Sequence, residues 1–377
     1  MTPKEKLEAL RGEIDTVNKD MLALFQKRQR ISGDIAAVKE EGNLAVTDIA
    51  REQRLLASAA ALADVDKQGE TAAFMRTLIS LSKLRQNDIL HLTHALDFPE
   101  PSPLPAGAAA YQGIAGAWGE HAAHRLFPGR ELFGQTYFED VFDAVKSGKA
   151  AIGVLPIENS RTGAIGEVYD LLRRNSCYIV GSMWVTVSQC LIGMPGAAAG
   201  DVREVLSHPE GFNQCRLFLK NRNWELTNVR NTAVAAVTVR ERGDIRYAAI
   251  GSRRAAEVNG LSVISPDIAD DSKNRTRFIA IAAEPAYAAE SNIISVTFSV
   301  SHQSGALVAA LSPFQLAGLN LTRIESRPVS VEKYRFFADI EGNIKSGAAR
   351  DAIAQAAMQT DYFEVLGCYS ETQEQPL

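Results

Sequence analysis

The chain has 377 residues, of which 46% are apolar and 23% are charged, a composition typical of a globular protein. At about 150 residues per domain, this length predicts two or three domains and excludes a single small module. The 40 Lys and Arg residues against 45 Asp and Glu residues give a net charge of −5, which argues against electrostatic binding to nucleic acid or to a membrane surface. The charged N-terminal segment and the lack of a long uncharged apolar run predict a cytosolic protein without a leader or a transmembrane helix.

The first ninety-odd residues predict helices only, because they contain no stretch of alternating apolar residues. In the first helix the apolar positions are spaced alternately by three and four residues, as in a packed helical seam: Leu7, Leu10, Ile14, Val17, Met21, Leu24, Ile31, Ile35 and Val38. Arg28 occupies a position within this seam, where a lone buried charge is costly, so we expect an anion to meet it. Lys39 lies on the same side, about 16 Å further along the helix axis. A seam this long predicts pairing with a second copy of the chain.

A proline-rich segment follows the helices and separates them from a region with a different pattern of apolar residues. FPEPSPLPAG, residues 98–107, alternates four prolines with other residues and predicts an extended linker. Beyond it, short β-rich runs alternate with helical segments, which indicates α/β architecture. The resulting domain prediction is a helical module at 1–97, the linker at 98–107, an α/β module at 108–285 and a terminal module at 286–377.

The four cysteines, Cys177, Cys190, Cys215 and Cys368, lie far apart without the spacing of a zinc site or a disulfide framework. We expect them to be reduced packing residues. No motif in the sequence calls for a metal or an organic cofactor.

The polar residues of the helical module form a recognisable set. Thr47 or Asp48 is an expected helix N-cap with Arg51 and Glu52 one turn inside, and Ser82 and Gln86 are spaced i, i+4 on the third helix. Each residue alone is more typical of a solvated helix face. Together, and across almost all of residues 1 to 90, they resemble the all-helical chorismate mutase family. The matching positions are Arg11, Arg28, Lys39, Asp48, Arg51, Glu52, Ser82 and Gln86.

The resemblance implies a dimeric helical bundle that rearranges chorismate, a dianion, to prephenate without a nucleophile or a metal. It implies that Arg28, together with Arg11 from the partner chain, holds the carboxylates, as the planar guanidinium fork suits. Lys39 and Gln86 are implied to stabilise the ether oxygen as it gains negative charge, with Glu52, Asp48, Arg51 and Ser82 assisting orientation. The protonation state of Glu52 is left open by the sequence.

The α/β module contains several distinctive segments between Tyr111 and Phe278. They are YQGIAGAWGEHAA, LPIENSRTGAIGEVYDLL, SHPEGFNQC, NTAVAA, AAIGSRRAAEVNGL and DSKNRTRF. These segments resemble prephenate dehydratase, which implies a two-lobed α/β fold similar to periplasmic binding proteins with the substrate between the lobes. Gly113, Gly116 and Gly119 lack the spacing of a dinucleotide site, so they are either plain turn residues or allow a carboxylate to approach the backbone.

By this resemblance, Thr276 in the TRF motif donates a hydrogen bond to the hydroxyl that leaves prephenate, and Arg277 is available for a substrate carboxylate. His208 is an alternative acid, although a lone histidine is more often structural. The PIENS segment follows a strand where α/β proteins bind ligands, although it would also suit an ordinary capped loop. The expected supporting contacts are Asn159, Ser160, Ser207, Gln214 and Thr232.

The terminal module predicts the element order βαββαβ, which is typical of a ferredoxin-like fold. Residues 293 to 370 resemble the ACT regulatory domain, a family that senses phenylalanine at a domain interface; dimerisation without a ligand is the alternative. The resemblance is carried by two motifs: Gly305, Ala306 and Leu307 with Leu311, and Glu325, Ser326, Arg327 and Pro328.

Together the three modules predict a bifunctional enzyme of phenylalanine biosynthesis. It would convert chorismate to prephenate and then prephenate to phenylpyruvate, under feedback inhibition by phenylalanine, as a homo-oligomer that is at least a dimer. Two alternatives remain: a dehydratase that uses arogenate, and a binding protein that senses amino acids and has lost its chemistry.

Overall fold

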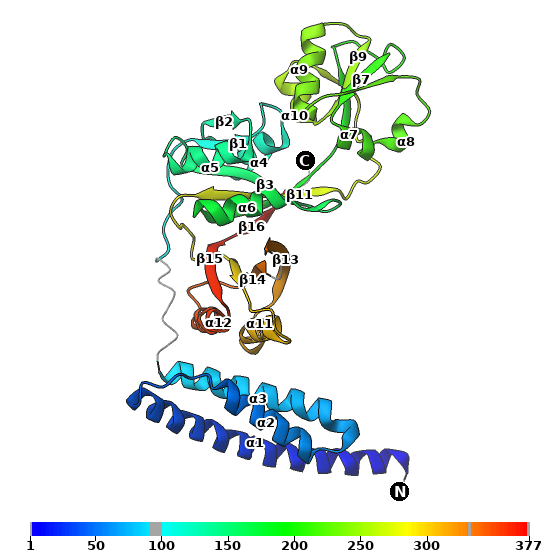
Figure 1. Ribbon diagram of the computed structural model, residues 1–377. Helices are drawn as coiled ribbons and strands as arrows, with labels where there is room; N and C mark the ends of the chain where they lie inside the picture. The colour runs from blue at the N-terminus through cyan, green and yellow to red at the C-terminus, as the bar shows by residue number, and fades with distance from the viewer. Residues whose placement is uncertain (1, 91–99, 331–332, 375–377) are drawn as a thin grey trace. The chain divides into compact units, whose positions relative to one another are not determined.

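The computed structural model describes residues 2–90, 100–330 and 333–374 (Figure 1). Phe98 and Pro99 of the predicted linker, and the last three residues of the predicted terminal module, lie outside this range. Its contacts divide the chain into two units, one of residues 1–97, 300–318 and 350–361, and one of residues 98–299, 319–349 and 362–377. In the part of the chain that is described, no helix has the length and apolar content needed to cross a membrane.

The N-terminal module is helical, as predicted, with α1 at Pro3–Glu41, α2 at Ile49–Leu62, a 3-10 turn at Val65–Lys67 and α3 at Gln68–Ile89 (Figure 1). A capping box formed by Thr2 and Glu5 begins α1, and Gly42 caps its end. The Asp48 side chain accepts a hydrogen bond from the Arg51 amide, so Asp48 is the N-cap of α2.

Much of the apolar seam of α1 is uncovered in the single chain. Leu10 is 57% exposed and Leu24 is 66% exposed, whereas Ser32 and Ala36 are the buried residues of this helix. A helix of 39 residues therefore finds cover within its own chain only over part of its length.

The first α/β lobe is built on a seven-stranded sheet with β1 at Ala109–Gln112, β2 at Leu132–Gln135, β3 at Ile152–Asn159, β4 at Gly163–Ala164, β5 at Tyr178–Thr186, β11 at Arg275–Ala282 and β16 at Glu371–Gln373. The strand order is β16-β5-β11-β3-β1-β2, and β4 pairs with β3. Helices α4 at Trp118–Leu126, α5 at Phe138–Lys146 and α6 at Gly166–Asn175 belong to this lobe. Apolar residues such as Leu155, Phe142 and Ile279 make the buried core.

The second lobe has a five-stranded sheet in the order β10-β6-β9-β7-β8. Its elements are β6 at Cys190–Gly193, β7 at Glu204–Ser207, α7 at Pro209–Gln214, α8 at Arg216–Leu219, β8 at Glu225–Asn228, α9 at Thr232–Arg242, β9 at Tyr247–Gly251, α10 at Arg253–Val258 and β10 at Ser262–Ser265. The chain enters this lobe after β5 and returns through β11, and the two crossing segments meet where the Val187 amide donates to the Asn274 carbonyl at 2.9 Å. The predicted two-lobed α/β architecture is therefore present.

The terminal module follows the order βαββαβ, with β12 at Ile293–Ser299, α11 at Ala306–Leu316, β13 at Leu321–Ser330, β14 at Lys333–Glu341, α12 at Gly347–Ala357 and β15 at Tyr362–Tyr369. Its antiparallel sheet has the order β13-β14-β12-β15. Phe337, Leu366 and Tyr369 of this sheet belong to the same buried cluster as Tyr169 and Ile279 of the first lobe. The sheet and the first lobe therefore share one hydrophobic core.

Candidate active sites

The helical module encloses a cavity of about 1050 Å³ between α1, α2, α3 and the loop that joins α1 to α2. Its walls include five cationic side chains against two carboxylates, although the whole chain carries a net charge of −5. A local excess of positive charge of this kind suits an anionic ligand. The structure brings seven of the eight predicted residues to this cavity: Arg28, Lys39, Asp48, Arg51, Glu52, Ser82 and Gln86.

Arg28 is held in the cavity wall by the third helix. Its Nη1 donates to the Leu78 carbonyl at 2.5 Å and also to the Ser82 hydroxyl, and the Ser32 hydroxyl lies 2.9 Å from that of Ser82. Desolvation by burial lowers the pKa of Arg28 below its ordinary value, although a guanidinium stays charged at neutral pH. The position of Arg28 within the apolar seam therefore places a cation in the wall of the cavity.

Lys39 and Gln86 also contribute polar atoms to this wall. The Lys39 Nζ donates to the Val46 carbonyl at 2.6 Å, which ties the end of α1 to the following loop. The Gln86 Nε2 donates to the Ser82 carbonyl at 3.3 Å, while the buried Gln86 Oε1 has no hydrogen-bond partner among the residues that the structure describes. Because an ammonium has three hydrogens and an amide nitrogen has two, both groups retain donor capacity for a ligand.

The cavity residues that the sequence analysis missed include the polar side chains of Lys27, Ser32 and Lys83. Ser32 lies four residues after Arg28, so helical spacing alone would have placed it on the same face. Lys83 forms an ion pair with Glu52 at 3.2 Å. This pair gives the Glu52 carboxylate a cationic neighbour within the module.

Arg11 is not brought to the cavity within the single chain. Its side chain is 61% exposed and pairs with Glu8 at 2.7 Å on the surface of α1. It lies 17 residues before Arg28, or about 26 Å along the helix axis. Its predicted role in a partner's cavity stays a prediction.

In the first lobe, Thr276 and Asn159 face each other where the chain returns from the second lobe. They are paired residues on the antiparallel strands β11 and β3, and the Asn159 Nδ2 donates to the Thr276 Oγ1 at 3.0 Å. Two backbone amides, of Arg161 and Thr162, donate to the Asn159 Oδ1, which fixes the orientation of the amide. Since the Thr276 oxygen accepts from Asn159, its own hydrogen is available to a ligand.

Ser160 reinforces the same corner of the lobe. Its hydroxyl accepts a hydrogen bond from the Arg275 amide at 2.9 Å, and its own amide donates to the Arg275 carbonyl at 2.9 Å. Ser160 thus joins the end of β3 to the start of β11, beside Thr276.

Arg277 does not lie with Thr276, which corrects the expectation that it binds a substrate carboxylate. It is buried, and its Nη1 lies 2.5 Å from the Asp339 Oδ2, while its Nη2 lies 3.0 Å from the Glu371 Oε1 and donates to the Tyr369 hydroxyl. The surrounding space is only about 10 Å³, too small for a substrate. Successive side chains of a strand point to opposite faces, so Thr276 and Arg277 diverge.

Two further expected contacts, Ser207 and Gln214, are buried in the second lobe. Ser207 is 0% exposed and donates to the Ile250 carbonyl at 3.1 Å, and Gln214 is 8% exposed and accepts from Gln189 at 3.0 Å. Their contact with a substrate stays a prediction. Thr232, the first residue of α9, lies half-buried beside them.

Two alternatives from the sequence resolve as structural features. His208 accepts a hydrogen bond from the Glu210 amide through Nδ1 at 3.1 Å and is the N-cap of α7. Gly116, with a φ of +87°, lies so close to α10 that a Cβ would come within 2.9 Å of the Ala255 Cα. The carboxylate that approaches its amide is that of Glu120, at 3.1 Å. The glycine turn therefore joins the two lobes.

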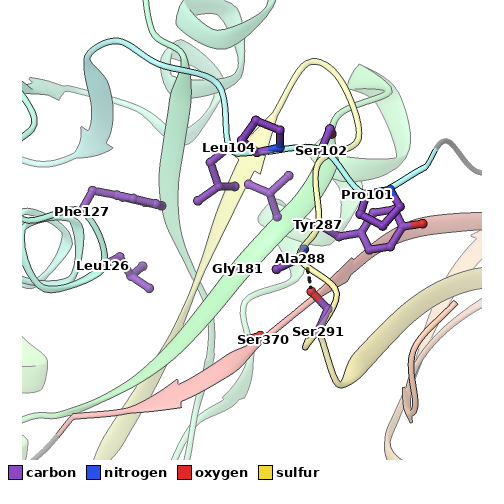
Figure 2. Close-up of a pocket in the computed structure, with 12 residues that line it drawn as sticks. Pro101, Ser102, Leu104, Leu126, Phe127, Gly181, Tyr287, Ala288, Ser291 and Ser370 are labelled. Carbon is purple, nitrogen blue, oxygen red and sulfur yellow. Dashed lines mark hydrogen bonds between the residues drawn. The ribbon is translucent and has the colours of Figure 1, made fainter. Parts of the chain in front are cut away.

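A separate pocket of about 400 Å³ lies beside the linker, where Leu104, Phe127 and Tyr287 surround it (Figure 2). The Ala288 amide donates to the Ser291 hydroxyl at 3.1 Å at its edge. None of the described residues that line it carries a charge, so it lacks the groups that either anionic substrate would need.

The predicted effector residues lie on two elements of the terminal module. Gly305 precedes α11 with a φ of +84°, a conformation that favours glycine, and Ala306 and Leu307 begin the helix. Glu325, Ser326, Arg327 and Pro328 lie on β13. Arg327 lies 3.6 Å from Asp170 of α6, so this segment touches the first lobe.

Two family models match separate parts of the chain. Residues 10–87 match the family model of chorismate mutase type II, and residues 109–286 match that of prephenate dehydratase. The bifunctional chorismate mutase/prephenate dehydratase of Escherichia coli strain K12 is 31% identical over 98% of this chain and 97% of its own length.

Two other relatives cover the C-terminal part. The chloroplastic arogenate dehydratase/prephenate dehydratase 1 of Arabidopsis thaliana is 36% identical over 69% of this chain and 71% of its own length. The crystal structure of prephenate dehydratase in complex with L-Phe from Arthrobacter aurescens has a TM-score of 0.64 and 26% identity, covering 70% of this chain and 89% of that one. With both catalytic modules matched and near-complete coverage of the bifunctional relatives, this chain belongs to the bifunctional chorismate mutase/prephenate dehydratase family.

Proposed function

We propose that this enzyme converts chorismate to prephenate in the helical cavity and prephenate to phenylpyruvate at the Thr276 site. The observation that carries the proposal is the cationic cavity, which gathers seven of the eight residues expected of a chorismate mutase in a chain of net negative charge. The experiment that tests it is the incubation of the purified protein with chorismate, followed by separate measurement of prephenate and phenylpyruvate. Chorismate that remains unconsumed would refute the first half, and prephenate that accumulates without phenylpyruvate would refute the second.

The first reaction needs conformational control rather than acid–base chemistry. One carbon–oxygen bond of the ether breaks and one carbon–carbon bond forms within the same molecule, so no atom is gained or lost. Arg28 pairs with a carboxylate of the compact conformer, and the hydrogens left on Lys39 and Gln86 point to the ether oxygen as negative charge grows on it. Binding the reactive conformer removes entropy before the reaction starts.

The second reaction releases carbon dioxide and a ring hydroxyl together. The electron pair of the breaking carbon–carboxylate bond moves into the ring, which becomes aromatic as the hydroxyl leaves as hydroxide and takes a proton from solvent to become water. Thr276 donates a hydrogen bond to that departing oxygen, and the amide of Asn159 polarises and orients the threonine hydroxyl. A threonine hydroxyl is a weak acid, so it polarises the leaving group rather than transferring its proton fully.

A second copy of this chain completes the first site. The uncovered seam of α1 supports pairing, because large apolar patches are rarely left in water. In such a dimer, Arg11 of one copy reaches the cavity of the other, which would explain why its own chain gives it only a surface partner.

Phenylalanine acts as the effector through the segments around Gly305 and on β13. The support is the ACT-like order of elements in the terminal module and a solved prephenate dehydratase relative in complex with L-Phe. L-phenylalanine should lower prephenate turnover while D-phenylalanine does not, and equal effects of the two enantiomers would argue against a stereospecific site.

A preference for arogenate is the second candidate, because an Arabidopsis relative named for arogenate and prephenate is 36% identical over the dehydratase part. The two substrates differ by an amino group. Steady-state comparison of both substrates separates the alternatives: a higher kcat/KM for prephenate supports the main proposal, and a higher value for arogenate supports this one.

A further inference from the structure

The two strands that carry the dehydratase site also carry an opposite pair of charges on their other face. In the antiparallel pairing of β11 with β3, Thr276 is paired with Asn159 and the next pair is Arg277 with Glu158. Paired residues project to the same face, and successive pairs alternate between faces. The charged pair of Arg277 and Glu158 therefore lies one residue away from the pair of Thr276 and Asn159 and points to the opposite side of the sheet.

The terminal sheet presents the complementary arrangement. On its strands β13 and β14, Arg323 is paired with Asp339. Arg277 meets Asp339 at 2.5 Å, and Arg323 meets Glu158 at 2.8 Å, so each cation of one sheet faces an anion of the other. These four side chains, Glu158, Arg277, Arg323 and Asp339, are named the interlocking quartet below.

The quartet lies in a sheltered environment. The side chains of Arg277, Asp339 and Arg323 are 4%, 11% and 13% exposed, and Glu158 is 27% exposed. Ser295 donates to Asp339, and Tyr369 accepts from Arg277 at 3.0 Å, whereas the buried Arg277 Nε has no hydrogen-bond partner among the described residues. Replacing Asp339 leaves Arg277 with Glu371 as its remaining anion, and replacing Arg323 removes the cation that faces Glu158, so in either case the local structure must move to accommodate the altered charge balance.

We infer that the interlocking quartet positions Thr276 and Asn159 for dehydration, so that the terminal sheet holds the catalytic strands in register. This inference rests on the proposed dehydratase function. Glu158 and Arg277 are the chain neighbours of Asn159 and Thr276. Arg323 and Asp339 are ion-paired with Glu158 and Arg277, respectively. None of the four needs to touch the substrate. A displacement of about 1 Å in a reacting group can cost as much as a hundredfold in rate, so a small shift of β11 against β3 would reach the chemistry.

The test uses the full-length protein with Asp339→Asn and Arg323→Gln, each of which removes one charge with little change in shape. We expect the dehydratase kcat to fall about tenfold while KM stays within about twofold and chorismate mutase activity stays unchanged. Arg242→Gln, which breaks the more exposed pair with Glu204 on the second lobe, is the matched control and should leave kcat unchanged. Arg323→Lys keeps the charge and should keep most of the activity.

A double-mutant cycle on Glu158 and Arg323 separates positioning by the pair from independent effects. Glu158→Gln and Arg323→Gln should each lower kcat, and their combination should cost no more than either change alone, because the two side chains act as one ion pair. Wild-type kcat in folded Asp339→Asn and Arg323→Gln would overturn the inference, as would a lower melting temperature without any change in kcat. If the wild type itself does not turn over prephenate, it is the proposed function that fails.

Discussion

The two candidate sites hold their polar groups in opposite ways. The mutase cavity is wide, carries five cations against two carboxylates, and takes its residues from helical positions along three helices. The Thr276 site relies on neutral groups, a hydroxyl and an amide bonded across two strands at 3.0 Å. The first is suited to clamp a dianion by charge, and the second to orient one hydrogen bond with a rigid frame. We therefore expect the loss of a charge to have the largest effect on chorismate turnover and the loss of a hydroxyl to have the largest effect on prephenate turnover.

The largest effect is expected from Arg28→Ala. Loss of the fork that pairs with a substrate carboxylate should lower chorismate turnover about 10³-fold, while prephenate turnover is unchanged. Steady-state assays with each substrate measure both values. Arg30→Ala, two residues away on an exposed face of α1, is the matched control. A comparable fall in both activities of a folded Arg28→Ala protein would break the distinction between the sites.

Thr276→Ala should have the reverse effect. Removal of the hydroxyl should lower prephenate turnover about 10²-fold to 10³-fold, because the departing oxygen loses its hydrogen-bond donor, while chorismate consumption continues. Thr276→Ser retains the hydroxyl and should keep most of the activity. Equal loss in both variants would show that the methyl group, rather than the hydroxyl, matters.

The same contrast explains how far the sequence could predict the sites. Along a helix, the spacing of Arg28, Lys39 and Ser82 with Gln86 sets which side chains share a face, and the structure places all four at one cavity. On β11, Thr276 and Arg277 are adjacent and point to opposite faces, so an expectation that both meet the substrate ignored strand alternation.

The surroundings of Arg277 could not be predicted without three-dimensional information. Its two partners, Asp339 and Glu371, lie more than sixty residues away along the chain, in strands whose approach depends on the shared core. The burial of Ser207 and Gln214 follows from the packing of α7 and β9 in the second lobe, and their contact with a substrate stays a prediction. The helical, α/β and βαββαβ patterns of elements were visible in the sequence, whereas the two-lobed arrangement was implied by the resemblance to prephenate dehydratase.

Mixing two inactive variants tests whether the mutase site takes residues from both chains of a dimer. If Arg11 serves the partner's cavity, Arg11→Ala and Arg28→Ala proteins should each be inactive toward chorismate. After subunit exchange, half the dimers combine both chains and one of their two sites is intact, so about a quarter of wild-type activity should return. Absence of any recovery, with exchange verified by differently tagged chains, would place Arg11 outside the site.

The smallest effect is expected at the end of the chain, where Glu374 ties β16 to the frame of the first lobe. Its carboxylate lies 2.6 Å from the His121 Nε2 and accepts from the Thr186 amide at 3.1 Å. Although burial opposes ionisation, the hydrogen bond and the charge interaction with His121 lower the pKa of Glu374 below its ordinary value. A lowered folded-state pKa means that Glu374 stabilises the fold above the pKa of the unfolded chain and loses this effect as pH falls through the folded value.

Glu374→Gln should therefore lower the melting temperature by about 2–4 °C at pH 7. The difference from wild type should shrink as the pH falls through the lowered pKa of Glu374, where the wild-type carboxylate becomes protonated. Thermal unfolding followed by circular dichroism at several pH values measures this. A difference that stays constant with pH would contradict the ionic contribution.

The most direct test of two independent sites in one chain is a time course with chorismate as the only substrate. The wild-type protein should produce prephenate first and phenylpyruvate after it, whereas Thr276→Ala should stop at prephenate. A wild-type reaction that yields no phenylpyruvate, or a Thr276→Ala reaction that still yields it at the wild-type rate, would contradict the account.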